Sequence, residues 1–224
     1  MINTKFLAGI ALALGLSSNA NAAITVFTDQ ASYLAAISAP ATDTFQNFVI
    51  TGTTPSPQTR AVGAYGYTMA VVSGTTDLFF GAGTVANPWL STDAANATIG
   101  FSNFTGDVFG VGGNFFGSNI TGAFAAGDVT LTATDADGTV SQTILNAGMS
   151  SFLGFVSTSG ITGMTLASSQ GNGPLWPTAD NLTLGGQLGS AVPEPATWAM
   201  MIIGFGAVGS MVRNSRRRNA FSAA

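Results

Sequence analysis

The sequence predicts an all-β domain folded as a two-sheet sandwich with jelly-roll-like strand order. Apolar residues in the central part of the chain mostly alternate with polar ones or form short runs, as they do in strands. Gly, Ser, Thr, Asn and Asp separate these runs at the spacing of turns, and no long segment has a helical period. Many short strands at turn-rich spacing are typical of two packed antiparallel sheets.

One short helix is expected near the start of this domain. Thr28 can cap the helix, and Asp29 is favourably placed at the positive end of the helix dipole. Tyr33 and Ile37 fall on one helical face, and Pro40 prevents the helix from continuing.

The remaining elements are expected to be strands, because each is an apolar run or alternation bounded by turn residues. These strands span residues 24–27, 44–49, 65–72, 77–80, 97–101, 108–116, 128–133, 140–145, 151–157, 161–167 and 181–184.

The clearest local unit is a β-hairpin over residues 129–144. Its first strand alternates apolar residues with threonines, and Asp137-Gly138 provides the backbone angles of a tight turn. Asp135 and Asp137 together could also bind calcium, but the distal Glu of a calcium loop is missing. The sequence therefore favours a turn over a metal site here.

The first residues of the chain have the pattern of a secretory signal peptide spanning residues 1–22. A positive residue, Lys5, precedes an apolar stretch at residues 6–16. Ala20-Asn21-Ala22 then offers the small residues that signal peptidase recognises, so cleavage is expected before Ala23. The rest of the chain is expected to be exported as an extracellular domain over residues 23–190.

The C-terminal segment, residues 191–218, has the pattern of a short membrane anchor. Residues 196–212 have no ionisable side chain, and a helix of this length spans roughly 25 Å, enough for a thin bilayer. Four arginines follow in the basic tail, residues 213–218, and positive flanks stay on the cytoplasmic side. We therefore expect a transmembrane helix that holds the precursor transiently in the inner membrane.

The order of these C-terminal parts resembles the PEP-CTERM sorting signal of Gram-negative bacteria, in its form with Trp-Ala after the signal. The matching positions are Pro193, Glu194, Pro195, Trp198, Ala199, Arg216, Arg217 and Arg218. The resemblance implies recognition of the Pro-Glu-Pro motif by an exosortase and loss of the helix and arginines. It also implies delivery to the cell surface or the extracellular polysaccharide matrix.

The composition of residues 23–190 excludes several classes of function. Nine aspartates face a single cation, Arg60, so the net formal charge of −8 excludes nucleic-acid binding. The chain has no cysteine and no histidine, which removes thiol nucleophiles, Ser-His-Asp catalysis and most zinc chemistry. Glycoside hydrolysis needs only two carboxylates, but no pair of aspartates stands out by its spacing. We predict that the domain is not an enzyme.

Two parts of the body resemble exported lectin-like or galactose-binding-like sandwiches. They are residues 26–37 followed by 43–45, and residues 152–156 together with 179–185. The resemblance implies carbohydrate binding and a structural calcium ion held by Asp180, with Asp43 as a companion ligand. The alternative is that Asp180 hydrogen-bonds its own turn beside Asn181.

Four aromatic residues are candidates for a carbohydrate-binding surface. Trp89 and Trp176 each adjoin a proline, so they are expected near loops or strand ends where a ring can stack on a sugar. Tyr65 and Tyr67 share one strand face and could extend such a platform. The alternative is that each tryptophan closes one end of the core.

Two functions of the body follow from these observations, and a secreted glycoside hydrolase ranks third behind them. The first is a non-enzymatic carbohydrate-binding module that contacts extracellular polysaccharide. The alternative is a structural component of the matrix or surface layer, whose Gly-, Thr- and Ser-rich surface associates with itself without a ligand.

Overall fold

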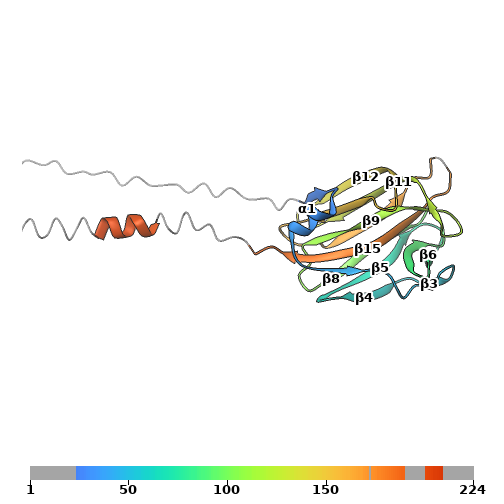
Figure 1. Ribbon diagram of the computed structural model, residues 1–224, viewed down its shortest axis with the longest axis horizontal. Helices are drawn as coiled ribbons and strands as arrows, with labels where there is room; N and C mark the ends of the chain where they lie inside the picture. Colours follow the sequence, from blue (N-terminus) through green and yellow to red (C-terminus); the bar gives the residue numbers. More distant parts are fainter. Residues whose placement is uncertain (1–23, 172, 190–199, 209–224) are drawn as a thin grey trace, which may run out of the picture. The chain divides into compact units, whose positions relative to one another are not determined.

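The structure is a computed structural model that describes residues 24–171, 173–189 and 200–208. The chain divides into two units, with the boundary between Gln187 and Leu188. The first unit contains every described strand and helix α1 (Gln30–Ala35), as Figure 1 shows. Because it has its own hydrophobic core, this unit has what a domain needs to fold alone.

The strands of the first unit form two antiparallel sheets. The nine-stranded sheet contains β1 (Thr25–Phe27), β2 (Ile37–Asp43), β3 (Thr53–Pro55), β6 (Leu78–Thr84), β7 (Asn87–Thr92), β9 (Gly110–Ser118), β10 (Phe124–Ala125), β13 (Phe152–Val156) and β15 (Trp176–Gln187). The six-stranded sheet contains β4 (Gln58–Val62), β5 (Tyr65–Ser73), β8 (Thr98–Thr105), β11 (Gly127–Thr134), β12 (Thr139–Ala147) and β14 (Gly163–Ser168). The prediction of an all-β fold with two sheets is confirmed. Its jelly-roll refinement stays a prediction.

Strand β15 is the central strand of the larger sheet, whose order is β1-β13-β9-β15-β7-β6-β3. On one side β15 pairs with β9 along nearly its whole length. On the other side its first half pairs with β7 and its second half with β2. The smaller sheet has the order β12-β11-β14-β8-β5-β4, so β12 and β4 are its two edges.

The start of the domain differs from its prediction. The helix cap is Asp29, whose Oδ1 accepts a hydrogen bond from the backbone N–H of Ser32 at 2.8 Å, and not Thr28. The helix ends before Ile37, which begins β2, and the strand expected at 44–49 is a loop. Pro40 is tolerated inside β2 because β2 is an edge strand that pairs only with β15. The pairing is also irregular at Pro40, which lies opposite the register shift between Leu184 and Gly186.

The main core lies between the two sheets and is rich in aromatic rings. Phe115 and Phe155 come from the nine-stranded sheet, whereas Met69, Phe101 and Leu131 come from the six-stranded sheet. All five side chains are almost fully buried. In β5 and β11 of the six-stranded sheet, buried positions alternate with less buried ones, which is the pattern from which the sandwich was predicted; β9 and β13 of the larger sheet are buried along almost their whole length.

A second, smaller cluster packs Tyr33 of α1 against Ile37 and Phe152. Tyr33 is fully buried, and its hydroxyl donates a hydrogen bond to the backbone carbonyl of Thr183 at 2.8 Å. The strands beneath are lined with glycines at the points of contact: Gly110 and Gly112 of β9, Gly154 of β13 and Gly185 of β15. A Cβ at any of the four would lie within 3 Å of Tyr33, Ile37 or Phe152.

Replacing Gly154 with Ala should destabilise the domain. The new Cβ would lie 2.5 Å from Cδ2 of the Tyr33 ring, and overpacking of this kind costs about 1–3 kcal/mol. Gly148→Ala is the matched control, because its nearest atom, Oγ of Ser151, is 4.0 Å away. Urea denaturation of both variants measures the difference. Equal stability of the two would contradict close packing of α1 on the sheet.

Candidate functional site

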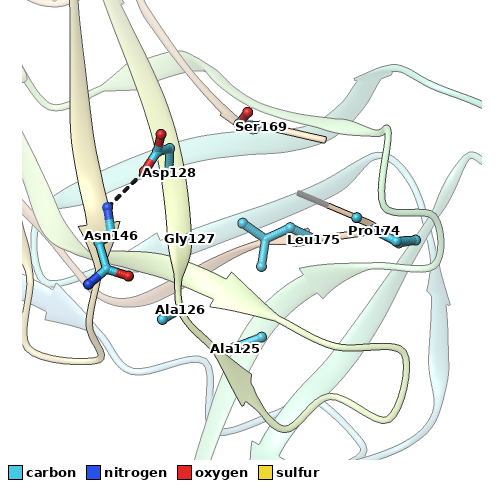
Figure 2. Close-up of a pocket in the computed structure, with 9 residues that line it drawn as sticks. Ala125, Ala126, Gly127, Asp128, Asn146, Ser169, Pro174 and Leu175 are labelled. Carbon is cyan, nitrogen blue, oxygen red and sulfur yellow. Dashed lines mark hydrogen bonds between the residues drawn. The ribbon is translucent and has the colours of Figure 1, made fainter. Parts of the chain in front are cut away.

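One hollow of the first unit has a volume of about 400 Å³, and Figure 2 shows the residues that line it. Its lining comes from the end of β10, the start of β11, the end of β12 and the segments around β14 and β15. The lining residues are Ala125, Ala126, Gly127, Asp128, Asn146, Ser169, Gly173, Pro174 and Leu175. We call this hollow the Asp128 pocket. Loops and strand ends on a rigid sandwich are common places for binding sites.

The polar groups of the Asp128 pocket are held in place by hydrogen bonds. Asp128 points away from the core because its neighbour Val129 is buried, and alternate residues of a strand face opposite ways. Its Oδ1 accepts a hydrogen bond from the backbone N–H of Asn146 at 2.8 Å, which Figure 2 shows. Its backbone carbonyl accepts another from Ser169 at 2.9 Å. The carboxylate, the Asn146 amide and the Ser169 hydroxyl therefore line one hollow and can bind a hydroxyl-rich ligand.

A smaller hollow of about 250 Å³ lies where β9 begins, whereas the Asp128 pocket lies beyond the end of β9. Phe104, Asp107, Phe109 and Ser159 are among its lining residues. Its volume falls below the roughly 300–1,000 Å³ of typical ligand pockets, whereas the Asp128 pocket falls inside that range. The Asp128 pocket is therefore the better candidate.

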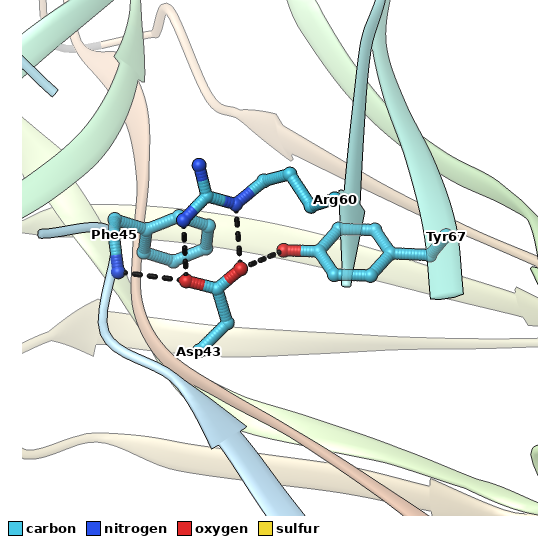
Figure 3. A network of polar contacts seen from close by, with 4 residues as sticks. All are labelled: Asp43, Phe45, Arg60 and Tyr67. Atoms are coloured by element: carbon cyan, nitrogen blue, oxygen red, sulfur yellow. Dashed lines mark hydrogen bonds and ion pairs between the residues drawn. The ribbon is translucent and has the colours of Figure 1, made fainter. Parts of the chain in front are cut away.

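A buried ion pair joins the two sheets at another place (Figure 3). Asp43, the last residue of β2, accepts hydrogen bonds from Arg60 of β4 through both carboxylate oxygens, at 2.5 and 2.6 Å. The Tyr67 hydroxyl of β5 donates a third hydrogen bond at 2.7 Å, and the backbone N–H of Phe45 donates a fourth at 2.9 Å. The Arg60 guanidinium also lies over the rings of Phe45 and Phe48, 5.4 and 5.7 Å from their centroids.

These contacts determine the charge state of Asp43. Burial alone would raise the pKa of this carboxyl, but the hydrogen bonds from Arg60 and Tyr67 outweigh burial and hold the pKa below its ordinary value. Burial and the neighbouring carboxylate raise the pKa of Tyr67, so its hydroxyl stays a donor. Asp43 is therefore a buried, charged and fully hydrogen-bonded group.

The two residues predicted to share a calcium ion have separate partners. Both oxygens of Asp43 accept hydrogen bonds within the Arg60 network. Asp180 of β15 is buried, and its Oδ2 accepts from the side-chain amides of Asn87 at 3.4 Å and Asn181 at 3.0 Å. Burial raises the pKa of Asp180. Among the described residues, no group of three or more Asp, Glu, His or Cys side chains is arranged to hold a metal.

The hydrogen bond to Asn181 is local, as in the alternative for Asp180, but both residues lie inside β15 and not in a turn. At the 129–144 hairpin the structure has a turn. Asp135 accepts hydrogen bonds from the backbone N–H groups of Asp137 and Gly138, at 2.8 and 3.0 Å, and from the Ser157 hydroxyl at 2.7 Å. Asp135 is thus occupied by capping its own turn. Calcium binding stays a prediction.

Three of the four candidate aromatic residues are buried, so the expectation that they face solvent is corrected. Tyr65, Tyr67 and Trp89 are 4, 1 and 8% exposed. Trp89 packs edge-on against Phe116, with ring centroids 4.9 Å apart, in agreement with the core alternative. Trp176 is partly exposed at the start of β15.

Only part of the C-terminal segment belongs to the described residues. Pro193, Glu194, Pro195, Trp198 and Ala199 lie outside them, as do the basic tail 213–218 and the signal peptide 1–22. Residues 200–208 form a helix within the anchor expected at 196–212. In the part of the chain that the structure describes, no helix has the length and hydropathy needed to cross a bilayer.

Comparison with protein families identifies this segment. The family model of the PEP-CTERM protein-sorting motif matches residues 191–218. The chain carries a PEP-CTERM sorting motif. The sequence prediction of this motif is confirmed, with the same boundaries. The motif is the sorting signal of exosortase substrates, which indicates a surface protein processed by an exosortase. Neither a curated protein nor a solved structure matches the chain.

Sequence reasoning missed both the Asp128 pocket and the Arg60 network. Asp128, Asn146 and Ser169 are far apart in the sequence, and only the pairing of β11 with β12 and β14 brings them together. The network had one visible signal, because Arg60 is the sole cation of residues 23–190. In a domain with nine aspartates, a single cation on an alternating strand is a reason to expect a buried pair.

Replacing Arg60 with Gln should destabilise the domain and change its response to acid. The change leaves Asp43 buried and unpaired, which costs about 3–5 kcal/mol. The pKa of Asp43 is lower in the folded than in the unfolded state, so the stabilisation exists above about pH 4 and disappears as the pH falls below it. Denaturation of wild type and variant between pH 7 and 3 tests both effects.

The double variant Asp43→Asn, Arg60→Gln is the control, because it removes the buried charge as well. It should recover part of the stability lost in Arg60→Gln. If the unfolding free energy of Arg60→Gln followed the same curve against pH as that of the wild type, the ion pair would not stabilise the fold.

Proposed function

We propose that this chain is an exported protein that an exosortase processes and delivers to the cell surface or the extracellular matrix. The observation that carries the proposal is the PEP-CTERM motif at residues 191–218. The signal-peptide pattern at 1–22 supports it, because this pattern directs export. The sequence has no cysteine, so no disulfide stabilises the domain outside the cell, and the core and the Arg60 network contribute to its stability there.

In this proposal the precursor is held briefly in the inner membrane. The anchor is the uncharged segment 196–212, and the arginines of residues 213–218 remain on the cytoplasmic side. The Pro-Glu-Pro motif precedes the anchor directly, where its prolines favour extended backbone. An extended segment beside the membrane is accessible to a membrane protease.

The body is proposed to be a non-enzymatic module that binds extracellular polysaccharide. The Asp128 pocket supports this role, because a fixed carboxylate, an amide and a hydroxyl are the groups that recognise sugar hydroxyls. In this proposal the ligand site is the Asp128 pocket, and the buried rings of Tyr65, Tyr67 and Trp89 belong to the core. Trp176 is still available for stacking, since it is partly exposed.

The second candidate function is a structural component of the matrix that associates with itself. One observation favours it: the outer face of the six-stranded sheet carries rows of hydroxyl side chains. Thr130 pairs with Thr143 at 2.8 Å between their hydroxyl oxygens, and Thr132 pairs with Ser141 at 2.7 Å. A surface of this kind carries no charge to oppose contact with another copy.

Replacing Glu194 with Ala should block processing, because it removes the only carboxylate of the sorting motif. The precursor is expected to accumulate in the inner-membrane fraction and to disappear from the surface fraction. Immunoblots of fractionated cells measure both. Asp93→Ala, a change of one carboxylate outside the motif, is the control and should be processed normally. Normal surface delivery of Glu194→Ala would refute the proposed route.

Replacing Asp128 with Ala should weaken binding to extracellular polysaccharide by about ten-fold or more, since a hydrogen bond to a charged group contributes roughly 1.5–3 kcal/mol. A pull-down with residues 24–189 measures it. Asp107→Ala in the smaller hollow is the matched control and should bind like wild type. Equal binding by the two variants would show that the Asp128 pocket does not hold the glycan.

A further inference from the structure

Residues 139–144 of strand β12 form a regular edge without the features that usually protect edges. Among the described strands β12 pairs only with β11, and Figure 1 shows it at the margin of the unit opposite β4. Its sequence, Thr-Val-Ser-Gln-Thr-Ile-Leu-Asn-Ala, has no charge, no proline and no glycine. Edge strands that must stay unpaired are usually short, charged, bulged or interrupted by proline.

The other described edges have such features. β4 carries the inward-pointing charge of Arg60, and β1 has only three residues. β3 also has three residues and ends at Pro55. β2 contains Pro40 and the irregularity opposite β15. β10 has only two residues. Among the described edges, the regular stretch 139–144 of β12 is therefore the one without such protection.

Each face of β12 is complementary to the same face of β12 in a second copy of the domain. On the inner face Val140 lies opposite Ala133, Gln142 opposite Leu131 and Ile144 opposite Val129. Val140 and Ile144 pack against the main core, whereas Gln142 between them is exposed. Beyond Ile144 the register with β11 shifts, so the regular part of the edge is residues 139–144.

We propose that β12 pairs in antiparallel fashion with β12 of a second copy, with Gln142 at the two-fold axis. In this register Val140 of one copy lies opposite Ile144 of the other, so the apolar inner row continues across the interface. On the outer face Ser141 lies opposite Thr143, which continues the hydroxyl rows of the sheet. The two six-stranded sheets then form one continuous sheet. The inference does not depend on glycan binding.

Charge makes this contact weak in dilute buffer. Each body has a net formal charge of −8, and Asp135 and Asp137 occupy the turn next to β12. Two copies therefore repel each other electrostatically, and salt screens this repulsion. We expect the association to strengthen as the salt concentration rises, which is the opposite of an interface held by surface ion pairs.

The test is a charge swap at Gln142 on the two-fold axis. Sedimentation velocity on residues 24–189 measures association. The protein concentration is on the order of 0.1–1 mM, where weakly bound dimers are populated. Gln142→Lys places two ammonium groups face to face, and Gln142→Glu places two carboxylates there. Each variant alone should be monomeric. Because Gln142 is exposed, neither change should alter the melting temperature. An equimolar mixture of the two should form a heterodimer at least as tight as wild type.

Thr59→Lys on β4 is the matched control, because it adds the same charge to an exposed position on the opposite edge of the same sheet. It should associate like wild type. Monomeric wild type at high salt would overturn the proposal, and so would dimers that Gln142→Lys leaves intact. A mixture of the Lys and Glu variants that stays monomeric would also overturn it.

A cysteine at the axis gives a second readout. The chain has no cysteine, so Gln142→Cys introduces a single thiol. Side chains directly opposite each other in an antiparallel pair have Cβ atoms about 4.5–5.5 Å apart, close enough for a disulfide to form with small adjustment. Mild oxidation should link Gln142→Cys into dimers, whereas Thr59→Cys should stay largely monomeric. Equal cross-linking of the two would contradict pairing through β12.

Discussion

One ion pair joins the two sheets of this domain. Asp43 ends β2 of the larger sheet, and Arg60 and Tyr67 belong to neighbouring strands of the smaller sheet. Arg60 is the only cation available to nine aspartates, so no other side chain can take its place. The guanidinium also covers Phe45 and Phe48, which connects the loop after β2 to the aromatic core. Arg60 therefore both neutralises the buried Asp43 and joins the two sheets at the end of β2.

The main core between the sheets is built from apolar packing. Glycines beneath Tyr33 let α1 lie directly on the outer face of the larger sheet. Among the described residues, no helix covers the outer face of the smaller sheet, which presents hydroxyl groups and the edge formed by residues 139–144 of β12. The Asp128 pocket opens at a sandwich end, where β11, β12 and the segment before β15 meet.

The sequence predicted those features that depend on local pattern. Alternation predicted most strands and the Asp137-Gly138 hairpin, and the Pro-Glu-Pro motif with its flanks predicted the sorting signal. It failed where long-range pairing overrides local preference. Residues 37–43 looked like a helix end because of Pro40, yet pairing with β15 makes them a strand. Tyr65, Tyr67 and Trp89 looked like surface rings because sequence patterns do not show which sheet covers a residue. The Asp128 pocket could not be predicted, because its residues meet only through strand pairing.

In the proposed route, residues 23–190 reach the cell surface as a self-contained module without the targeting segments that flank them. Intact-mass spectrometry of the protein released from the cell surface tests this most directly. The account predicts a chain that begins at Ala23 and lacks the anchor at 196–212 and the arginines of 213–218. Surface protein whose mass still includes Arg216, Arg217 and Arg218 would contradict it.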